Sequence, residues 1–260
     1  MSELKHELDR IERLNDFVRR MNEVERDLSH PTIRPKDAAT LILIDRSTRV
    51  PKVLLGKRNA RHKFMPGKFV FPGGGVDASD KTMPVARPLD KHAEARLMER
   101  FHKGSAVRAR ALALAAIRET CEETGLLLGT RMLENRAEAA NIPSGPWTPF
   151  AQHNVLPDLG AIHFVGRAIT PPGRPRRFDA RFFTMDAGAI AHRIEGITGP
   201  DAELVELVWM PLGEAKQLDM PAVTGVMLEE LDARIADGLK HALPVPFYRM
   251  LRGQFLRELL

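Results

Sequence analysis

The sequence predicts an α/β fold. Short apolar runs with strand character alternate along the chain with longer runs that have helical periodicity. At 260 residues the chain can form one large domain, or one domain with appendages, around a well-buried core. The expected strands are 37–44, 52–58, 68–71, 160–169, 181–185 and 203–212, and the expected helices are 3–28, 90–101, 113–126, 213–216 and 223–235.

The first expected helix is amphipathic. Its apolar residues recur at steps of three and four, and they are Leu4, Leu8, Ile11, Leu14, Val18, Met21, Val24 and Leu28. The domain or a second subunit must cover this stripe, so a homodimer is possible, while the mixed charges disfavour a membrane-surface helix. We therefore divide the chain into an N-terminal helix and linker (1–35) and a main domain (36–260) that ends in a helical tail from about residue 222 to residue 260.

Composition limits the class of protein. Apolar residues make up 43% and charged residues 28%, as in ordinary globular proteins. The single cysteine, Cys121, excludes an internal disulfide, the N-terminus lacks the apolar core of a signal peptide, and no apolar run could cross a bilayer. These features predict a soluble, cytoplasmic protein with no membrane partner. The net charge of +5 favours anionic ligands without separating nucleic acid from small phosphorylated molecules.

The expected helix 113–126 carries three carboxylates on one face. Glu119, Glu122 and Glu123 are related as i, i+3 and i+4, and Gly125 is a natural C-terminal stop. Like charges packed this closely repel, and a hard cation such as Mg²⁺ or Mn²⁺ removes the repulsion because it binds several carboxylate oxygens at once. A solvated acidic surface is the alternative interpretation of these three residues alone.

A glycine-rich stretch upstream, Phe71–Asp77, decides between these interpretations. Together with the helix it resembles the Nudix box, Gly-x5-Glu-x7-Arg-Glu-U-x-Glu-Glu-x-Gly-U, where U is bulky and apolar. The second half matches as 118–126, with Thr120 as the imperfect position. The first half matches through Gly74, followed after five residues by Asp80 in place of Glu, and the spacer then runs to 37 residues (81–117). Whether Asp80 replaces the box Glu stays open.

This resemblance implies a Nudix fold, in which a mixed sheet lies between helices and the box forms a loop, a helix and a loop. It also implies a metal-dependent hydrolase that acts on a small-molecule diphosphate. In that reading Glu119, Glu122 and Glu123 bind Mg²⁺ or Mn²⁺, and Arg118 orients one of them. The backbone at Gly73 and Gly74 permits close approach of the loop to the helix and the metal.

A further carboxylate is expected from the strand 203–212. In proteins with this box, a Glu shortly before a Trp often binds metal or takes a proton from water. Glu203 and Glu206 both precede Trp209 at a suitable spacing. The sequence does not decide between them, so both are catalytic candidates.

Three stretches are similar to the branch of Nudix proteins that cleaves coenzyme A. They are 54–74, the insertion 81–106 after Asp80, and 171–183. This similarity implies coenzyme A or acyl-coenzyme A as substrate. The basic residues that could bind it are Arg58, Arg61, Lys63, Arg176 and Arg177. The alternatives are solvated loop residues and, around Asp179, a structural Arg–Asp pair.

The insertion has an expected role of its own. Because it begins at Asp80, it must emerge near the metal site, where it could shape a pocket or act as a lid. Its apolar residues could line a groove for the coenzyme A arm, although core packing is the commoner fate of such residues.

Two other functions remain open. One is a Nudix pyrophosphatase for ADP-ribose, NADH, nucleotide sugars or RNA 5′ ends, and the other is a Nudix-fold sensor that binds a nucleotide without cleaving it. The complete Glu set and the lack of a convincing helix-turn-helix weigh against the sensor. An aromatic content of 6% gives little support for RNA binding, so we expect no nucleic-acid partner.

Overall fold

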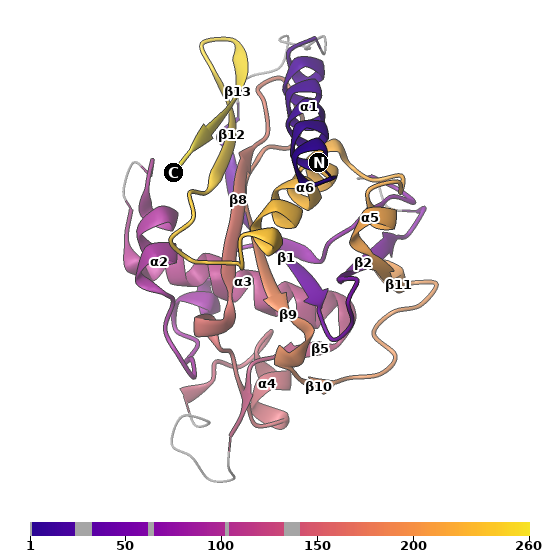
Figure 1. The fold of residues 1–260 in the computed structure, drawn as a ribbon. Coiled ribbons are helices and arrows are strands. Elements are labelled where there is room, and N and C mark those ends of the chain that lie inside the picture. The colour runs from indigo at the N-terminus through magenta and orange to yellow at the C-terminus, as the bar shows by residue number, and fades with distance from the viewer. Residues whose placement is uncertain (1, 24–32, 62–64, 102–103, 133–140) are drawn as a thin grey trace.

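In the computed structural model, a nine-stranded mixed sheet runs through the middle of the described residues (Figure 1). The structure describes the chain except residues 1, 24–32, 62–64, 102–103 and 133–140. The strands are β1 (Lys36–Asp45), β2 (Lys52–Arg58), β3 (Phe69–Val70), β4 (Gly73–Gly75), β8 (His163–Ile169), β9 (Phe178–Asp186), β11 (Leu204–Pro211), β12 (Pro246–Leu251) and β13 (Gln254–Leu259). Their order is β11-β2-β1-β9-β8-β12-β13, with β3 beside β2 and β4 beside β1. The pairs β1–β9 and β8–β12 are parallel and the other pairs are antiparallel, so the predicted α/β class is confirmed.

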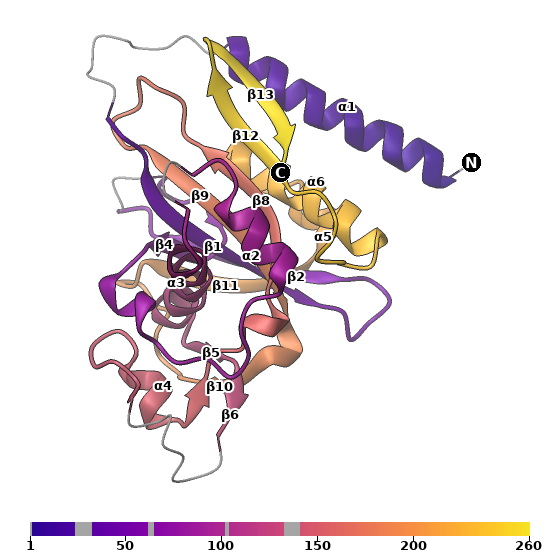
Figure 2. The same ribbon diagram turned by 90° about the vertical axis from the view of Figure 1, so that its left-hand side faces the viewer.

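Helices cover both faces of this sheet (Figure 2). Leu41 and Leu43 of β1 pack into a cluster with α2 (Lys91–Met98) and α3 (Ala106–Thr124). Ile42 and Ile44 point the other way, into a cluster with α1 (Ser2–Glu23), α5 (Leu212–Ala215) and α6 (Ala222–Ala236). Burial on both faces explains why the sequence of β1 is an unbroken apolar run.

Smaller elements close the end of the sheet near α3. The pairs β5 (Leu126–Leu128) with β10 (Ile190–Arg193) and β6 (Thr130–Arg131) with β7 (Val155–Leu156) form two short ribbons. The helix α4 (Thr148–Gln152) lies between β6 and β7 in the chain, with Phe150 fully buried. These elements were not predicted, because runs of two to five residues carry too little periodicity to detect.

The helix that carries the acidic residues is longer than predicted. Ser105 caps its N-terminus by accepting a hydrogen bond from the backbone of Arg108 (3.2 Å), and Gly125 ends it with a φ of 74°. Most of its faces are buried, including Thr120, whose hydroxyl donates to the carbonyl of Ala116 (2.8 Å). This bond satisfies the hydroxyl and explains how Thr is accepted at an apolar position of the box.

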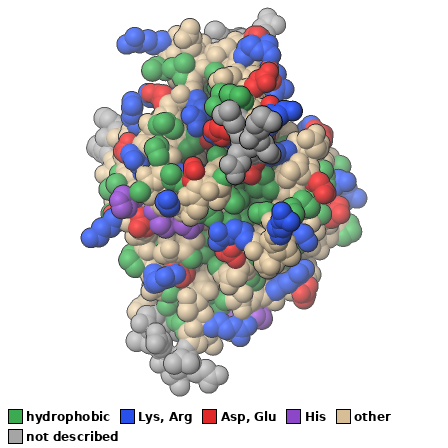
Figure 3. Space-filling model, in the orientation of Figure 1, with side chains coloured by type: hydrophobic (Ala, Val, Ile, Leu, Met, Phe, Trp, Pro, Cys, Tyr) green, Lys and Arg blue, Asp and Glu red, His purple; other side chains and the backbone are tan. Residues whose placement is uncertain are grey.

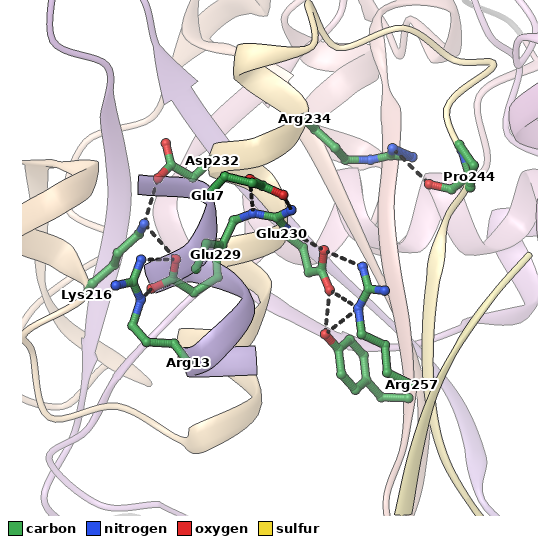
Figure 4. A network of polar contacts seen from close by, with 11 residues as sticks. Glu7, Arg13, Lys216, Glu229, Glu230, Asp232, Arg234, Pro244 and Arg257 are labelled. Atoms are coloured by element: carbon green, nitrogen blue, oxygen red, sulfur yellow. Dashed lines mark hydrogen bonds and ion pairs between the residues drawn. The ribbon is translucent and has the colours of Figure 1, made fainter. Parts of the chain in front are cut away.

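The N-terminal helix is attached to α6. Leu14 and Phe17 are buried, and Arg13 donates two hydrogen bonds to Glu229 (2.6 and 3.1 Å; Figure 4). Toward its N-terminus the apolar stripe is uncovered, since Leu8 is 57% exposed. The domain therefore covers only part of the stripe. Among the described helices, none is long and apolar enough to cross a membrane.

The predicted helical tail is wrong beyond α6. Only 222–236 is helical in this region, and 246–259 forms the hairpin β12–β13. Arg252 and Gly253 make its turn with φ values of 50° and 84°, the backbone that favours a tight hairpin. Glu230 of α6 holds this hairpin through two hydrogen bonds from Arg257 (2.7 and 3.1 Å; Figure 4).

The insertion joins the core rather than standing apart from it. Its helix α2 ends at Met98, where we had expected a helix that continued to residue 101. Leu97 is 1% exposed and packs in the cluster beside α3. The ring of Phe101 lies under the guanidinium groups of Arg108 and Arg181, at 3.9 and 4.5 Å. Leu97 thus packs in the core and does not line a groove, and the described part of the insertion packs against the sheet.

A pair of stacked histidines lies beside α2. The rings of His163 and His241 are 4.2 Å apart between centroids. Burial lowers the pKa of His163 to about 4, and the neighbouring charges that act on it belong to His241, Arg46, Arg234 and Asp90. Of these, only Asp90 favours the protonated ring.

Candidate active site

An ion pair joins the two ends of the interrupted box. Asp80 is fully buried and receives hydrogen bonds from Arg118 Nε (2.9 Å) and Nη2 (3.2 Å), and its Oδ2 also accepts from the backbone of Asp77 (2.7 Å). The two halves of the box therefore meet in space although a 37-residue spacer (81–117) separates them in the sequence. Asp80, which the sequence left in doubt, belongs to the site.

Arg118 also holds two of the predicted metal ligands. Its Nη1 donates to Oε1 of Glu119 and Oε2 of Glu122, both at 2.8 Å, and its Nη2 donates to the carbonyl of Gly75 (2.6 Å). Burial alone would lower the pKa of Arg118, but the carboxylates of Asp80 and Glu119 raise it above its ordinary value. The guanidinium is therefore charged and orients more than the single carboxylate that we predicted.

The glycine-rich loop approaches Glu119 very closely. A Cβ built at Gly74 would lie 2.4–2.5 Å from the carboxyl atoms of Glu119, whereas a Cβ at Gly75 would meet nothing within 4 Å. Gly74 is therefore needed for this contact, as predicted. Burial raises the pKa of Glu119, Arg118 opposes the shift, and the nearby charges of Glu122 and Asp80 add to it.

Glu123 lies deeper, between the loop and β11. Its Oε2 accepts a hydrogen bond from the backbone of Gly73 (3.3 Å). Burial raises its pKa well above the ordinary value, and the charges of Glu203 and Glu119 raise it further. Glu203 is thus electrostatically coupled to Glu123 of α3.

The structure separates the two candidates on β11. Glu203 lies just before β11 and accepts a hydrogen bond from Arg58 Nη2 (2.6 Å). Both residues are exposed, but Glu206 lies opposite Lys57 of β2, whereas the charge of Glu203 raises the pKa of Glu123. Of the two, Glu203 joins the site.

The predicted substrate-binding residues divide into several groups. Arg58 is bound to Glu203, and Arg61 pairs with Asp201 at the surface (3.1 Å). Arg177 donates to two backbone carbonyls, those of residues 170 (3.0 Å) and 33 (2.7 Å), so its guanidinium holds the chain. Arg176 is exposed on the turn before β9, and Lys63 lies outside the described residues.

Around Asp179 the structural alternative is correct. Asp179 binds Arg167 through two hydrogen bonds (2.8 and 2.7 Å), and Arg181 lies 3.1 Å from it. Arg181 is fully buried and also donates to Asp37 (2.9 Å). Burial lowers the pKa of Arg181 to about 10, and Arg167 adds to this effect.

The carboxylates are not yet gathered around one point. Across the part of the chain that the structure describes, no group of three or more His, Cys, Asp or Glu side chains is set up to hold a metal ion. Arg118 binds one carboxylate oxygen of Glu119 and one of Glu122. The donor set nevertheless fits a hard divalent cation. Neighbouring carboxylates raise the pKa of Glu119 and of Glu123, and a shared positive charge would relieve this repulsion.

One residue that the sequence did not reveal is Asn59. It is buried immediately after β2, and its side-chain amide donates to the carbonyls of Pro200 (2.8 Å) and Ala202 (3.2 Å), in the segment that carries Glu203. An Asn directly after a strand often bonds to nearby backbone, which was the available signal. Its distant partners could not be read from the sequence.

Fold and site together define an α/β protein in which a glycine-rich loop and one helix present clustered carboxylates beside a mixed sheet. The NUDIX domain model matches residues 34–231, and the chain belongs to the Nudix family. Proteins of this family generally use divalent metal ions. Among solved structures, the chain is similar to a NUDIX hydrolase from Alicyclobacillus acidocaldarius, with a TM-score of 0.57, 28% identity, and coverage of 78% of this chain and 93% of that one.

Two curated relatives are acyl-coenzyme A diphosphatases. The NUDT19 protein of Gallus gallus is 29% identical and that of Xenopus laevis 33%, each over 51% of this chain. The matches cover 47% and 46% of the two relatives, so the chain spans about half their length.

Proposed function

We propose that this chain is a metal-dependent hydrolase that cleaves the diphosphate bond of a nucleoside diphosphate derivative. The observation that carries the proposal is the contact of Glu119 and Glu123 with the Gly73–Gly74 loop. Arg118 binds Glu119 and Glu122, and the charge of Glu203 acts on Glu123. Such a concentration of negative charge would repel a diphosphate. A divalent cation is therefore a requirement of the proposal.

Mg²⁺ or Mn²⁺ would be held by Glu119, Glu122 and Glu123. Arg118 binds Oε1 of Glu119 and Oε2 of Glu122, and we assign their other oxygens to the cation. When bound, the cation supplies a Lewis acid that offsets charge on the diphosphate and activates a water. Arg118 opposes the rise in the pKa of Glu119 and limits the rotation of both carboxylates, which lowers the cost of binding the cation.

Glu203 is the residue to which we assign proton transfer. Arg58 binds its Oε1, so Oε2 is the atom that accepts the proton from the attacking water. Its coupling to Glu123 supports this assignment, because a base must lie close to the carboxylates that hold the cation. Glu206 has no part in the proposal.

The test is hydrolysis by the purified protein in Mg²⁺ or Mn²⁺ with a panel of diphosphate compounds. We expect phosphorylated products, loss of activity on chelation, and a loss of at least about 100-fold in Glu122→Gln and Glu123→Gln variants. Glu214→Gln is the matched control, because Glu214 is exposed on α5. Full activity in both box variants would end the metal assignment.

For the substrate we propose coenzyme A or acyl-coenzyme A, cut to 3′,5′-ADP and 4′-phosphopantetheine or its acyl form. The support is the similarity to two acyl-coenzyme A diphosphatases, together with basic side chains that precede the loop in the sequence and could meet a 3′-phosphate. Arg61 is one of these, being 80% exposed next to Asp201. If a basic side chain binds the 3′-phosphate, dephospho-coenzyme A should lose about 1.5–3 kcal/mol of binding.

One competition assay separates the substrates. Coenzyme A, acetyl-coenzyme A, dephospho-coenzyme A, ADP-ribose and NADH are offered at equal concentration, and kcat/KM is compared. A preference for ADP-ribose or NADH, without discrimination for the 3′-phosphate, would leave the hydrolase and end the coenzyme A proposal. Binding without cleavage of any compound would favour a sensor.

RNA remains a weaker candidate. On the face drawn in Figure 3, basic and acidic side chains are interspersed and form no continuous basic surface. A protein that follows a phosphate backbone needs such a surface. That face offers no support for a nucleic-acid substrate.

A further inference from the structure

The end of β2 is built around the segment that carries Glu203. Leu204 lies opposite Arg58 in the β2–β11 pair, so the Glu203 side chain starts beside the last residues of β2. The Arg58 side chain is only 16% exposed, and its Nη2 lies 2.6 Å from Glu203 Oε1. The Glu203 side chain is 42% exposed, so water is excluded on the Arg58 side only, and the short charged hydrogen bond restricts the orientation of the carboxylate.

Asn59 fixes the backbone of the same segment. Its side-chain amide donates to the carbonyls of Pro200 (2.8 Å) and Ala202 (3.2 Å), and its own N–H donates to the carbonyl of Glu203 (3.0 Å). Its Oδ1 accepts from the backbone N–H of Arg61 (3.0 Å). One buried residue therefore joins the end of β2 to three carbonyls of residues 200–203.

The strand pair is irregular at this point. The register shifts between Leu204 and Glu206, which bends β11 locally. Gly56 makes room for the bend, because a Cβ there would lie 2.4 Å from Leu204 Cδ1. The bulge places Glu203 and Glu206 differently, so that Glu203 reaches Arg58 and Glu206 lies opposite Lys57.

We infer that Arg58 and Asn59 are positioning residues, which hold the Glu203 carboxylate at the α3 carboxylates and do not bind substrate. The inference rests on the proposed function and changes the role that the sequence suggested for Arg58. Arg58 sets the side chain of Glu203, and Asn59 sets its backbone. Neither residue is a catalytic residue in this scheme.

A double-mutant cycle tests the role of Arg58. We expect Arg58→Met to lower kcat by about 10–100-fold while KM changes by less than about twofold. In a protein that already carries Glu203→Gln, Arg58→Met should lower kcat almost no further, because both changes remove the function of the Glu203 carboxylate. Arg58→Lys, which can still donate one hydrogen bond, should recover part of kcat. Arg46→Met is the control, since Arg46 forms a half-exposed ion pair with Asp186 (2.9 Å).

Opposite results would overturn the inference. A raised KM in Arg58→Met, or losses that multiply with those of Glu203→Gln, would make Arg58 a substrate-binding residue. A loss in Asn59→Ala that persists when Glu203 is already Gln would show that Asn59 acts elsewhere. Melting temperatures of every variant identify losses that come from unfolding alone, and Arg58→Lys keeps the test open if Arg58→Met fails to fold.

A structural measurement separates this inference from the proposed function. Crystal structures of Arg58→Met and Asn59→Ala should show the Glu203 carboxylate displaced, with Glu119 and Glu123 in place. An unmoved Glu203 would refute the positioning role even if the protein is an active hydrolase. A displaced Glu203 in a protein that cleaves no diphosphate would support the role and end the proposed function.

Discussion

Replacing Gly74 by Ala tests how the loop and the helix make one site. The new Cβ would lie 2.4 Å from the Glu119 carboxyl carbon, whereas an ordinary contact needs at least 3.4 Å, so the carboxylate must move by about 1 Å. Arg118 and the surrounding burial restrict where the Glu119 carboxylate can go. The movement therefore changes its position relative to Glu122, which Arg118 also binds. A misplacement of about 1 Å can cost about 100-fold in rate, or about 2.7 kcal/mol.

Gly75→Ala is the matched control. It adds the same methyl group one residue later, where a Cβ meets nothing within 4 Å, and it keeps the carbonyl that Arg118 binds. Neither glycine has a positive φ, so alanine fits the backbone at both positions. The assay is kcat/KM for diphosphate cleavage in Mn²⁺, with melting temperatures measured in parallel. Equal activity in the two variants would refute the reasoning.

Three further predictions follow from charged and titratable side chains that hold the fold. Asp80→Asn should lower the free energy of unfolding by about 1.5–3 kcal/mol, because Arg118 loses its buried charged partner while it keeps Glu119 and Glu122, and a loss below about 1 kcal/mol in urea titration would contradict this. The pKa of His163, about 4, lies below the value of about 6.5 expected in the unfolded chain. The unfolded state therefore takes up the proton first, and stability should fall as the pH drops from about 6.5 toward 4. In His163→Gln this part of the pH dependence of Tm should disappear, and an unchanged slope would exclude His163 as its source. Arg177→Ala should destabilise the fold by about 1.5–3 kcal/mol and leave KM unaltered, because its guanidinium binds backbone carbonyls; a large rise in KM at unchanged stability would return it to the substrate site.

The local part of the site could be predicted because helix geometry follows from neighbouring residues. Residues at i, i+3 and i+4 share a face whatever the rest of the chain does, so Glu119, Glu122 and Glu123 were found together. The stop at Gly125 and the close approach at Gly74 are equally local, since each depends on a missing side chain. Six of the nine strands of the central sheet were apparent from their apolar runs, whereas β4, β12 and β13 were not.

What the sequence left open depends on residues that meet only after folding. Asp80 reaches Arg118 across an insertion whose path no motif describes, and burial of both charges makes their pairing necessary. A bulge in β11 decides between Glu203 and Glu206, and a bulge depends on how two strands pack, as Gly56 and Leu204 do here.

The C-terminal residues show the same division. Their apolar residues are compatible with a helix or a strand, and a short run does not distinguish the two. Residues 246–259 are stabilised as a hairpin by two contacts. Strand β12 pairs in parallel with β8, and Arg257 donates hydrogen bonds to the buried carboxylate of Glu230. The sequence by itself determined the helix, its carboxylates and the loop that touches them, since these depend on residues close in the chain. Only the tertiary structure decided which distant charges are buried together, because an unpaired buried charge is costly and each must find its partner in space.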